Sequence, residues 1–103
     1  MSRRRGAVYA YKPVLQRSGQ SMRRRIVSAY PLNESSLPVV LGLQVIDYDP
    51  DSLLSVRLAG HGWAVITTIE QVINSRLDEY SAGVISADEQ QAVDNALRAV
   101  LDL

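Results

Sequence analysis

The sequence of 103 residues contains no cysteine, one histidine and no long hydrophobic run. The absence of cysteine excludes disulfide scaffolds, zinc fingers, iron–sulfur sites and thiol catalysis. One histidine, His61, cannot build a metal site of several imidazoles. The longest apolar run, Val39–Leu43, stops at Gln44 and is far too short to span a bilayer. We therefore expect a soluble, cytoplasmic protein with no metal, no cofactor and no membrane partner.

Phenylalanine is also absent and one tryptophan occurs, so the core must be built from Val, Leu, Ile and Ala. Apolar residues nevertheless make up 47% of the chain and charged residues 21%, which is typical of globular proteins and excludes wholesale disorder. No repeat, low-complexity tract or linker divides the sequence, so we predict a single domain over residues 1–103.

The net charge of zero conceals a strong asymmetry along the chain. Residues 1–25 carry eight arginines and lysines and no acid, whereas residues 26–103 carry three arginines and eleven acids. Such a basic segment favours an anionic partner, either nucleic acid or an acidic protein. The alternative is that the acidic remainder of the same fold neutralises these cations.

Strands and loops are predicted to alternate over the first two thirds of the chain. Runs rich in β-branched and aliphatic residues predict strands at residues 6–12, 23–30, 38–47, 53–58 and 63–69. The run at 38–47 is apolar on both faces and is therefore expected to be central. Residues 12–22 predict a long loop, and residues 31–37 predict a loop or a single helical turn.

The C-terminal segment predicts an amphipathic helix. Ser86 and Glu89 form a capping box, in which each side chain accepts a hydrogen bond from the other residue's backbone N–H. The helix places four apolar residues on one stripe: Val93, Leu97, Val100 and Leu101. Together these elements predict a mainly β fold with α structure, a small curved antiparallel sheet closed by the C-terminal helix.

Three segments resemble those of a known family in order and spacing. Arg4–Tyr9 opens with basic residues, a glycine and an apolar–aromatic strand, and Ile26–Ser28 precedes a loop that contains Asn33. The C-terminal part contains Ile69–Val72, Ser75–Leu77, Gly83 and a capped helix with a leucine-rich end over Ser86–Leu103. In these features the chain resembles the PemK/MazF toxin family.

The resemblance implies an Src-homology-3-like barrel of the CcdB/PemK kind. It implies the toxin of a type II toxin–antitoxin system, a metal-independent, sequence-selective endoribonuclease that cleaves single-stranded RNA by 2′-hydroxyl attack. It further implies a homodimer with RNA across a groove, and a cognate antitoxin whose acidic, disordered segment fills that groove.

The sequence departs from the family pattern where the chemistry is expected. Met22 stands where the family has an arginine at the start of its second strand, six residues before Ser28. Arg24 lies two residues later, on the same strand face and about 7 Å further along, and is the best substitute. Gln44 stands where the family has Thr or Ser, and an amide can donate a hydrogen bond to phosphate but cannot act as a base.

Arginine suits phosphate chemistry because its guanidinium offers a planar, permanently charged fork to two oxygens. We expect Arg24 to stabilise the charge that develops on the phosphate, with Gln44 beside it. The predicted RNA-binding cations are Lys12, Arg17, Arg23 and Arg25. The alternative is a solvated basic strand edge that prevents pairing with another sheet.

His61 has an unperturbed pKa near neutrality and is a candidate general acid or base. A histidine in a tight turn such as Gly60–Trp63 is, however, more often incidental than catalytic. Asp47, Asp49 and Asp51 form an acidic run that fits the solvated rim of a turn better than a metal site.

The departures at Met22 and Gln44 motivate a second function of a different class. The chain is alternatively a catalytically lapsed, dimeric PemK-like binding module that titrates a protein or nucleic-acid partner. A gyrase poison of the CcdB type is disfavoured, because the C-terminal Leu101–Leu103 does not match that group's Trp-Gly-Ile.

Overall fold

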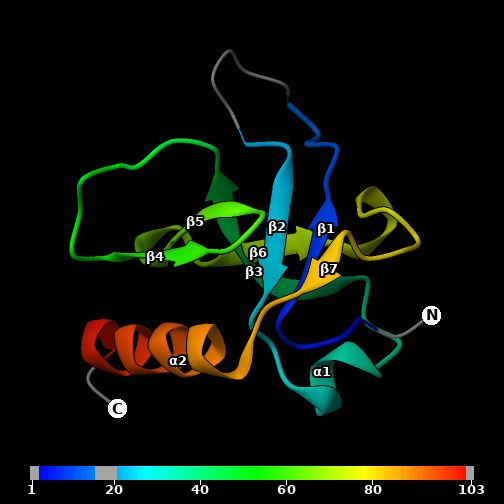
Figure 1. The fold of residues 1–103 in the computed structure, drawn as a ribbon. Helices are drawn as coiled ribbons and strands as arrows, with labels where there is room; N and C mark the ends of the chain where they lie inside the picture. The colour runs from blue at the N-terminus through cyan, green and yellow to red at the C-terminus, as the bar shows by residue number, and fades with distance from the viewer. Residues whose placement is uncertain (1–2, 16–20, 102–103) are drawn as a thin grey trace.

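Seven short strands form one antiparallel, strongly curled sheet with a helix against one side (Figure 1). The computed structural model describes residues 3–15 and 21–101. The strands are β1 (Ala7–Ala10), β2 (Arg23–Ile26), β3 (Val39–Ile46), β4 (Ser55–Leu58), β5 (Gly62–Val65), β6 (Glu70–Ile73) and β7 (Gly83–Val84). The helices are α1 (Tyr30–Asn33) and α2 (Ala87–Leu101), with 3-10 turns at Ile66–Thr68 and Asn74–Arg76. The predicted fold class is confirmed.

The long strand β3 organises the sheet, as its two-sided apolar pattern predicted. The strand order is β4-β5-β3-β2-β1-β7, and β6 also pairs with β3. The first half of β3 pairs with β6 and its second half with β5, while β2 occupies the opposite edge. Two successive strands therefore share one edge of β3, which requires the chain to bend between them.

The predicted strand at 63–69 is wrong in its second half, because β5 ends at Val65 and a 3-10 turn leads into β6. The Thr68 hydroxyl donates a hydrogen bond to the Val65 carbonyl (2.6 Å) and accepts one from the Gln44 backbone N–H (2.9 Å). At Gln44 the Thr68 side chain therefore accepts the backbone hydrogen bond that a neighbouring strand would otherwise accept. Threonine hydroxyls compete with regular backbone pairing in this way.

Each face of the sheet carries its own apolar core. One face buries Ala7, Tyr9, Tyr11, Ile26, Val40, Val72 and Leu77. The other, which α2 covers, buries Val8, Leu43, Val45, Leu58, Ala64, Ile66, Ile85 and Val93. Successive residues of a strand alternate between these two environments, so adjacent side chains on one strand serve different cores.

The capping box of α2 is confirmed. The Ser86 hydroxyl accepts the Glu89 N–H (3.2 Å), and the Glu89 carboxylate accepts the Ser86 N–H (3.1 Å). The apolar stripe is confirmed in part: Val93 is fully buried and Leu97 packs against the core. The last two residues of the stripe are exposed, Val100 by 39% and Leu101 by 47%, because the final turn lies beyond the covered core.

The Ser28 and Asn33 pair joins α1 to the sheet. The Ser28 hydroxyl accepts the Leu41 N–H (3.1 Å), and the Asn33 amide donates to the Ser28 carbonyl (2.7 Å). Both side chains are buried, so these motif residues act structurally. Within the described ranges, neither helix has the length and apolar character needed to cross a bilayer.

Candidate functional site

The three consecutive arginines of β2 point to opposite faces of the sheet. Arg24 pairs with Tyr9 on β1 and with Gln44 on β3, so all three side chains share one face. Arg23 and Arg25 therefore project to the other face, which α2 partly covers. The three arginines therefore do not form one basic patch, because side chains that are adjacent along a strand lie on opposite faces of the sheet.

Arg24 is held in place by several contacts on its face of the sheet. Its Nε donates to the Glu70 carboxylate at 2.8 Å, and its Nη1 donates to the Ser21 and Arg23 carbonyls, both at 2.8 Å. The Tyr11 ring centre lies 4.5 Å from the guanidinium carbon. The residue is 1% exposed, and its Nη2 has no hydrogen-bond partner among residues 3–15 and 21–101. The guanidinium is thus held in one orientation, with Nη2 as the nitrogen that bonds to none of the described residues.

Glu70 on β6 is a site residue that the sequence reasoning missed. Gly42 of β3 pairs both with Ile26 of β2 and with Glu70, so it lies between the strands of the ion pair. A Cβ on Gly42 would lie 3.6 Å from the Arg24 Cβ and 3.0 Å from a Val72 methyl carbon. The Glu70 side chain remains 38% exposed. The sequence offered one indication of Glu70, because it lies in the Ile69–Val72 segment that resembles the family. That segment does not indicate that Arg24 is its partner.

Gln44 faces the same side as Arg24 and is half-buried. Its backbone N–H is held by the Thr68 hydroxyl, which anchors the strand at this point. The structure therefore brings together two of the predicted catalytic residues, Arg24 and Gln44, and adds Glu70.

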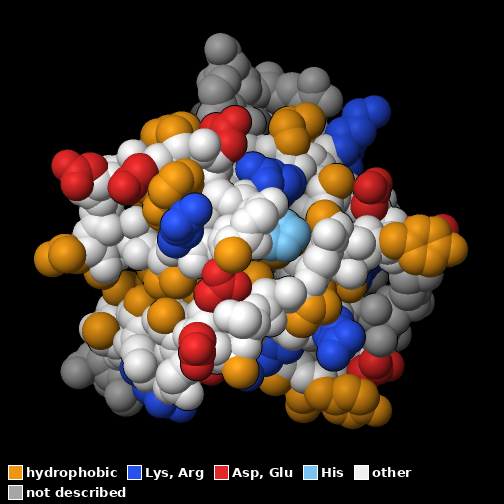
Figure 2. All heavy atoms as spheres, in the orientation of Figure 1, with side chains coloured by type: hydrophobic (Ala, Val, Ile, Leu, Met, Phe, Trp, Pro, Cys, Tyr) orange, Lys and Arg blue, Asp and Glu red, His pale blue; other side chains and the backbone are white. Residues whose placement is uncertain are grey.

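His61 lies on the other face of the sheet and does not join them. Arg23 donates from Nη1 to the His61 carbonyl at 2.5 Å, which places the turn on the Arg23 side. The ring packs against Gly83, since a Cβ there would lie 2.9 Å from the His61 Nε2. The imidazole reaches the surface on the face shown in Figure 2. The structure therefore does not bring His61 to Arg24 and Gln44, because the sheet lies between them.

Glu89 of α2 reaches the turn that contains His61. Its carboxylate accepts a hydrogen bond from the Ala59 backbone N–H at 2.6 Å. Burial acts to raise the pKa of Glu89, but hydrogen bonds from Ala59 and Ser86 and the charge of His61 outweigh it. The pKa therefore lies below its ordinary value of 4.5. This carboxylate ties the helix N-terminus to the β4–β5 turn.

Arg25 is fully buried beneath α2 and has no exposed surface for RNA. Its Nη1 donates to the Ile26 carbonyl (3.1 Å) and its Nη2 to the Gln90 amide oxygen, while Nε has no partner in the described part of the chain. Burial lowers the pKa of Arg25 to about 10, against the opposing charge of Asp94. This side chain joins β2 to α2 and presents no exposed surface to a phosphate in this structure.

Two cations beside the Arg24 face are Lys12 and Arg76. They line an open cavity of about 310 Å³ together with Ala10, Tyr11, Met22 and Asp78. Lys12 is exposed and its backbone N–H donates to the Arg76 carbonyl at 3.0 Å. Tyr11 connects the cavity to Arg24, because its ring contacts that guanidinium. Arg17, the remaining predicted RNA-binding residue, lies outside the described residues.

Acidic and imidazole groups are dispersed in the part of the chain that the structure describes. No three His, Asp or Glu side chains there are grouped so that they could hold a metal ion.

The overall architecture is shared with solved endoribonuclease and MazF structures, although no family model and no curated protein matches the chain. An endoribonuclease from a mycobacterial species superposes with a TM-score of 0.80 at 18% identity, covering 100% of this chain and 94% of that one. An endoribonuclease in complex with its cognate antitoxin, also mycobacterial, gives 0.80 at 19% identity over 96% and 94%. The MazE–MazF structure from Deinococcus radiodurans gives 0.80 at 13% identity over 100% and 99%. The chain thus has a curled antiparallel sheet with a C-terminal helix, which is the MazF fold.

Proposed function

We propose that this protein is the toxin of a type II toxin–antitoxin system and a metal-independent, sequence-selective endoribonuclease. The observation that carries the proposal is the Arg24–Glu70 pair at 2.8 Å on the face that also presents Gln44. This pair lies in a fold that the chain shares with structures described as endoribonucleases and as MazF. The substrate is single-stranded RNA, and the site of action is the cytoplasm.

The chemistry is an internal displacement at a phosphodiester. Glu70 accepts the proton of the RNA 2′-hydroxyl, since its half-exposed carboxylate is the base beside Arg24. The 2′-oxygen bonds to phosphorus and the bond to the 5′-oxygen breaks, leaving a cyclic phosphate, while water supplies the proton of the 5′-hydroxyl. Arg24 offers its Nη2 and Gln44 its amide to the phosphate oxygens, where negative charge increases.

The RNA backbone extends from Arg24 over Tyr11 toward Lys12 and Arg76. Cations along this path bind phosphates without reading sequence. In our proposal Arg17 also binds RNA, and Arg23 does so from the opposite face of the sheet, whereas the buried Arg25 does not. An antitoxin with an acidic, disordered segment would occupy the same surface, since both ligands are anionic.

A second copy of the chain is the proposed occupant of an apolar groove beside α2. The groove, about 230 Å³, is lined by Arg5, Val27, Leu41, Ile69, Asp94, Leu97, Arg98 and Leu101. It adjoins the exposed end of α2, so apolar surface would be buried by self-association.

The test is cleavage of a long mixed-sequence RNA by the purified protein, with and without EDTA, followed by mapping of the new ends. We expect EDTA-resistant cuts at a short motif, lost in Arg24→Ala and retained in Arg57→Ala, a control at an exposed arginine of β4. Arg24→Lys separates activity from folding, because it keeps the charge but not the forked geometry. Absence of cleavage by the folded wild-type protein would contradict the proposal.

The lapsed binding module remains the second candidate, favoured by the 1% exposure of Arg24 and by Gln44 in place of a hydroxyl. Growth arrest distinguishes the two in cells. The enzyme requires Arg24 for arrest, whereas a titrating module arrests growth with Arg24→Ala and loses this effect only when the dimer is broken.

A further inference from the structure

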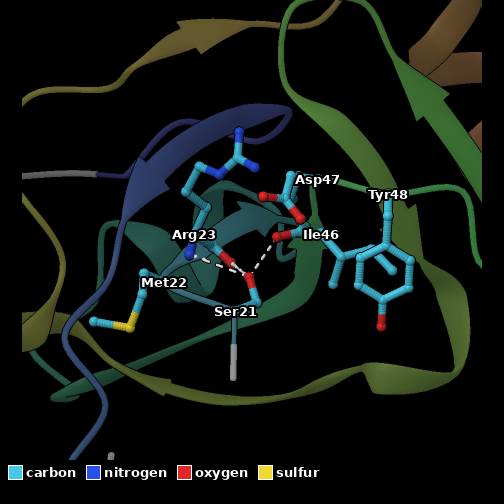
Figure 3. Close-up of a pocket in the computed structure, with 7 residues that line it drawn as sticks. Ser21, Met22, Arg23, Ile46, Asp47 and Tyr48 are labelled. Carbon is cyan, nitrogen blue, oxygen red and sulfur yellow. Dashed lines mark hydrogen bonds between the residues drawn. The ribbon is translucent and has the colours of Figure 1, made fainter. Parts of the chain in front are cut away.

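A separate cavity opens where β2 begins and β3 ends (Figure 3). It is lined by Ser21, Met22, Arg23, Val45, Ile46, Asp47 and Tyr48 and has a volume of about 340 Å³. This is near the lower limit of about 300 Å³ for small-molecule sites. The space suits one planar heterocycle rather than a longer ligand.

Arg23 and Asp47 face this cavity from neighbouring strands and do not pair with each other. Figure 3 draws both side chains among the residues that line the cavity. The ion pairs among the described residues join other partners, Arg5 with Asp94 and Arg24 with Glu70. Arg23 is held through Nη1 by the His61 carbonyl, which leaves its Nε and Nη2 without a side-chain partner in residues 3–15 and 21–101. A fixed donor and an acceptor are therefore available to the same ligand.

The other side chains that line the cavity are mostly apolar, and the Ser21 hydroxyl is already hydrogen-bonded within the protein. Tyr48 is 62% exposed and Met22 47% exposed, so the cavity has an aromatic ring and a thioether at its rim. Such groups stack on unpaired bases, whose faces are all aromatic. The Ser21 hydroxyl accepts the Arg23 N–H at 3.2 Å and lies against the Val45 and Arg23 carbonyls, so it shapes the wall.

We propose that this cavity binds a guanine base of single-stranded RNA; the proposal rests on the function proposed above. Guanine carries two adjacent donors, N1–H and the 2-amino group, which match the two oxygens of Asp47. Beside them it carries the acceptors O6 and N7, which match the free nitrogens of Arg23. Adenine and cytosine have one amino group and no adjacent ring N–H, and uracil has one ring N–H and no amino group.

The position of the cavity makes this base a neighbour of the bond that is cut. Arg23 directly precedes Arg24 in β2, with its side chain on the opposite face. A strand of RNA that wraps the end of β2 would place a base against Arg23 and a phosphate against Arg24. Arg23 would then select the base, and the next residue, Arg24, would act on the phosphate.

Binding of mononucleotides to the full chain tests the site without requiring cleavage. Guanosine monophosphate is titrated by calorimetry or NMR against inosine, adenosine and cytidine monophosphates. We expect guanosine monophosphate to bind about tenfold or more tightly than the others, the discrimination of one bidentate base contact. Inosine monophosphate, which lacks the 2-amino group, is the sharpest comparison, because it keeps N1–H, O6 and N7.

Asp47→Asn should remove this preference, since an amide replaces one acceptor by a donor. Asp51→Asn is the matched control: it makes the same charge change in the same acidic run, outside the cavity. Its positive φ of 53° is one that asparagine tolerates. Both residues are exposed, so the fold is retained and the comparison is direct.

Three outcomes overturn the guanine site: equal binding of the nucleotides, no binding in the millimolar range, or a preference unchanged in Asp47→Asn. Cut-site mapping keeps the two proposals distinguishable. Guanine-selective binding without RNA cleavage supports the base site and contradicts the endoribonuclease. Cleavage without a guanine at a constant position beside the cut contradicts the base site alone.

Discussion

The Nε of Arg24 lies 2.8 Å from the Glu70 carboxylate, although 46 residues separate the two along the chain. The pair spans from β2 to β6, and both strands are held in register by β3. A buried guanidinium is thereby joined to a half-exposed carboxylate, so the anion is the member that contacts solvent and ligand directly.

Replacement of this carboxylate tests its role as a base. We expect Glu70→Gln to lower the cleavage rate by about a hundredfold to ten-thousandfold, the usual contribution of a general base. The amide keeps the shape of the side chain and a hydrogen bond to Arg24, so folding should be retained. Single-turnover cleavage of a short RNA measures the effect, with Glu79→Gln, an exposed acid, as control. An unchanged or increased rate would show that Glu70 restrains Arg24 instead.

Stability measurements test the structural assignment of Arg25. Gln90→Ala should lower the free energy of unfolding by about 1–3 kcal/mol, because it leaves Nη2 of a buried cation without its acceptor. Gln91→Ala, on the exposed side of α2, should change it little. Urea titration provides the values.

Arg25→Met also tests whether Arg25 is structural, by removing the buried charge itself. Replacement of a buried charged group by an apolar side chain of similar volume is expected to be neutral or stabilising by about 1–4 kcal/mol. RNA affinity should not change. A large loss of affinity with an intact fold would restore Arg25 to the RNA-binding surface.

The stability of the protein should fall in acid through Glu89. The pKa of Glu89 is lower in the folded protein than its ordinary value of 4.5, so its contribution is present above pH 4.5 and is lost as the pH falls through the folded value. Thermal unfolding from pH 7 to pH 3 should show a smaller decline in Tm for Glu89→Gln than for the wild type. Asp88→Asn, in the same helical turn, is the control. Parallel pH profiles for all three proteins would refute this assignment.

The salt dependence of RNA binding tests the path over Tyr11. Each phosphate contact to single strands contributes about 0.7 to the slope of log affinity against log salt concentration. Lys12→Ala and Arg76→Ala should each reduce the slope by about that amount, whereas Arg57→Ala should not. A slope that is the same in all variants would place the RNA elsewhere.

Local features of the fold were predictable because their causes are local. The Ser86–Glu89 cap depends on residues three apart, and the central position of β3 follows from an apolar run bounded by turn residues. The bend after Val65 was not predictable, since the Thr68 hydroxyl that stabilises it bonds to Gln44 on another strand. Residues of high β propensity thus adopt a 3-10 turn there.

The sequence by itself determined most of the elements, though not the 3-10 turn after Val65 or the strands β6 and β7, and it determined the basic N-terminal quarter. It also determined that Arg24 faces away from its two neighbours in β2, because strand parity is a property of the backbone. Tertiary structure alone decided which of the arginines is buried, which acid Arg24 meets, and that His61 lies across the sheet. The physical reason is the same in each case. These outcomes depend on strand register and on which face α2 covers, and both arise from contacts between residues far apart in the chain.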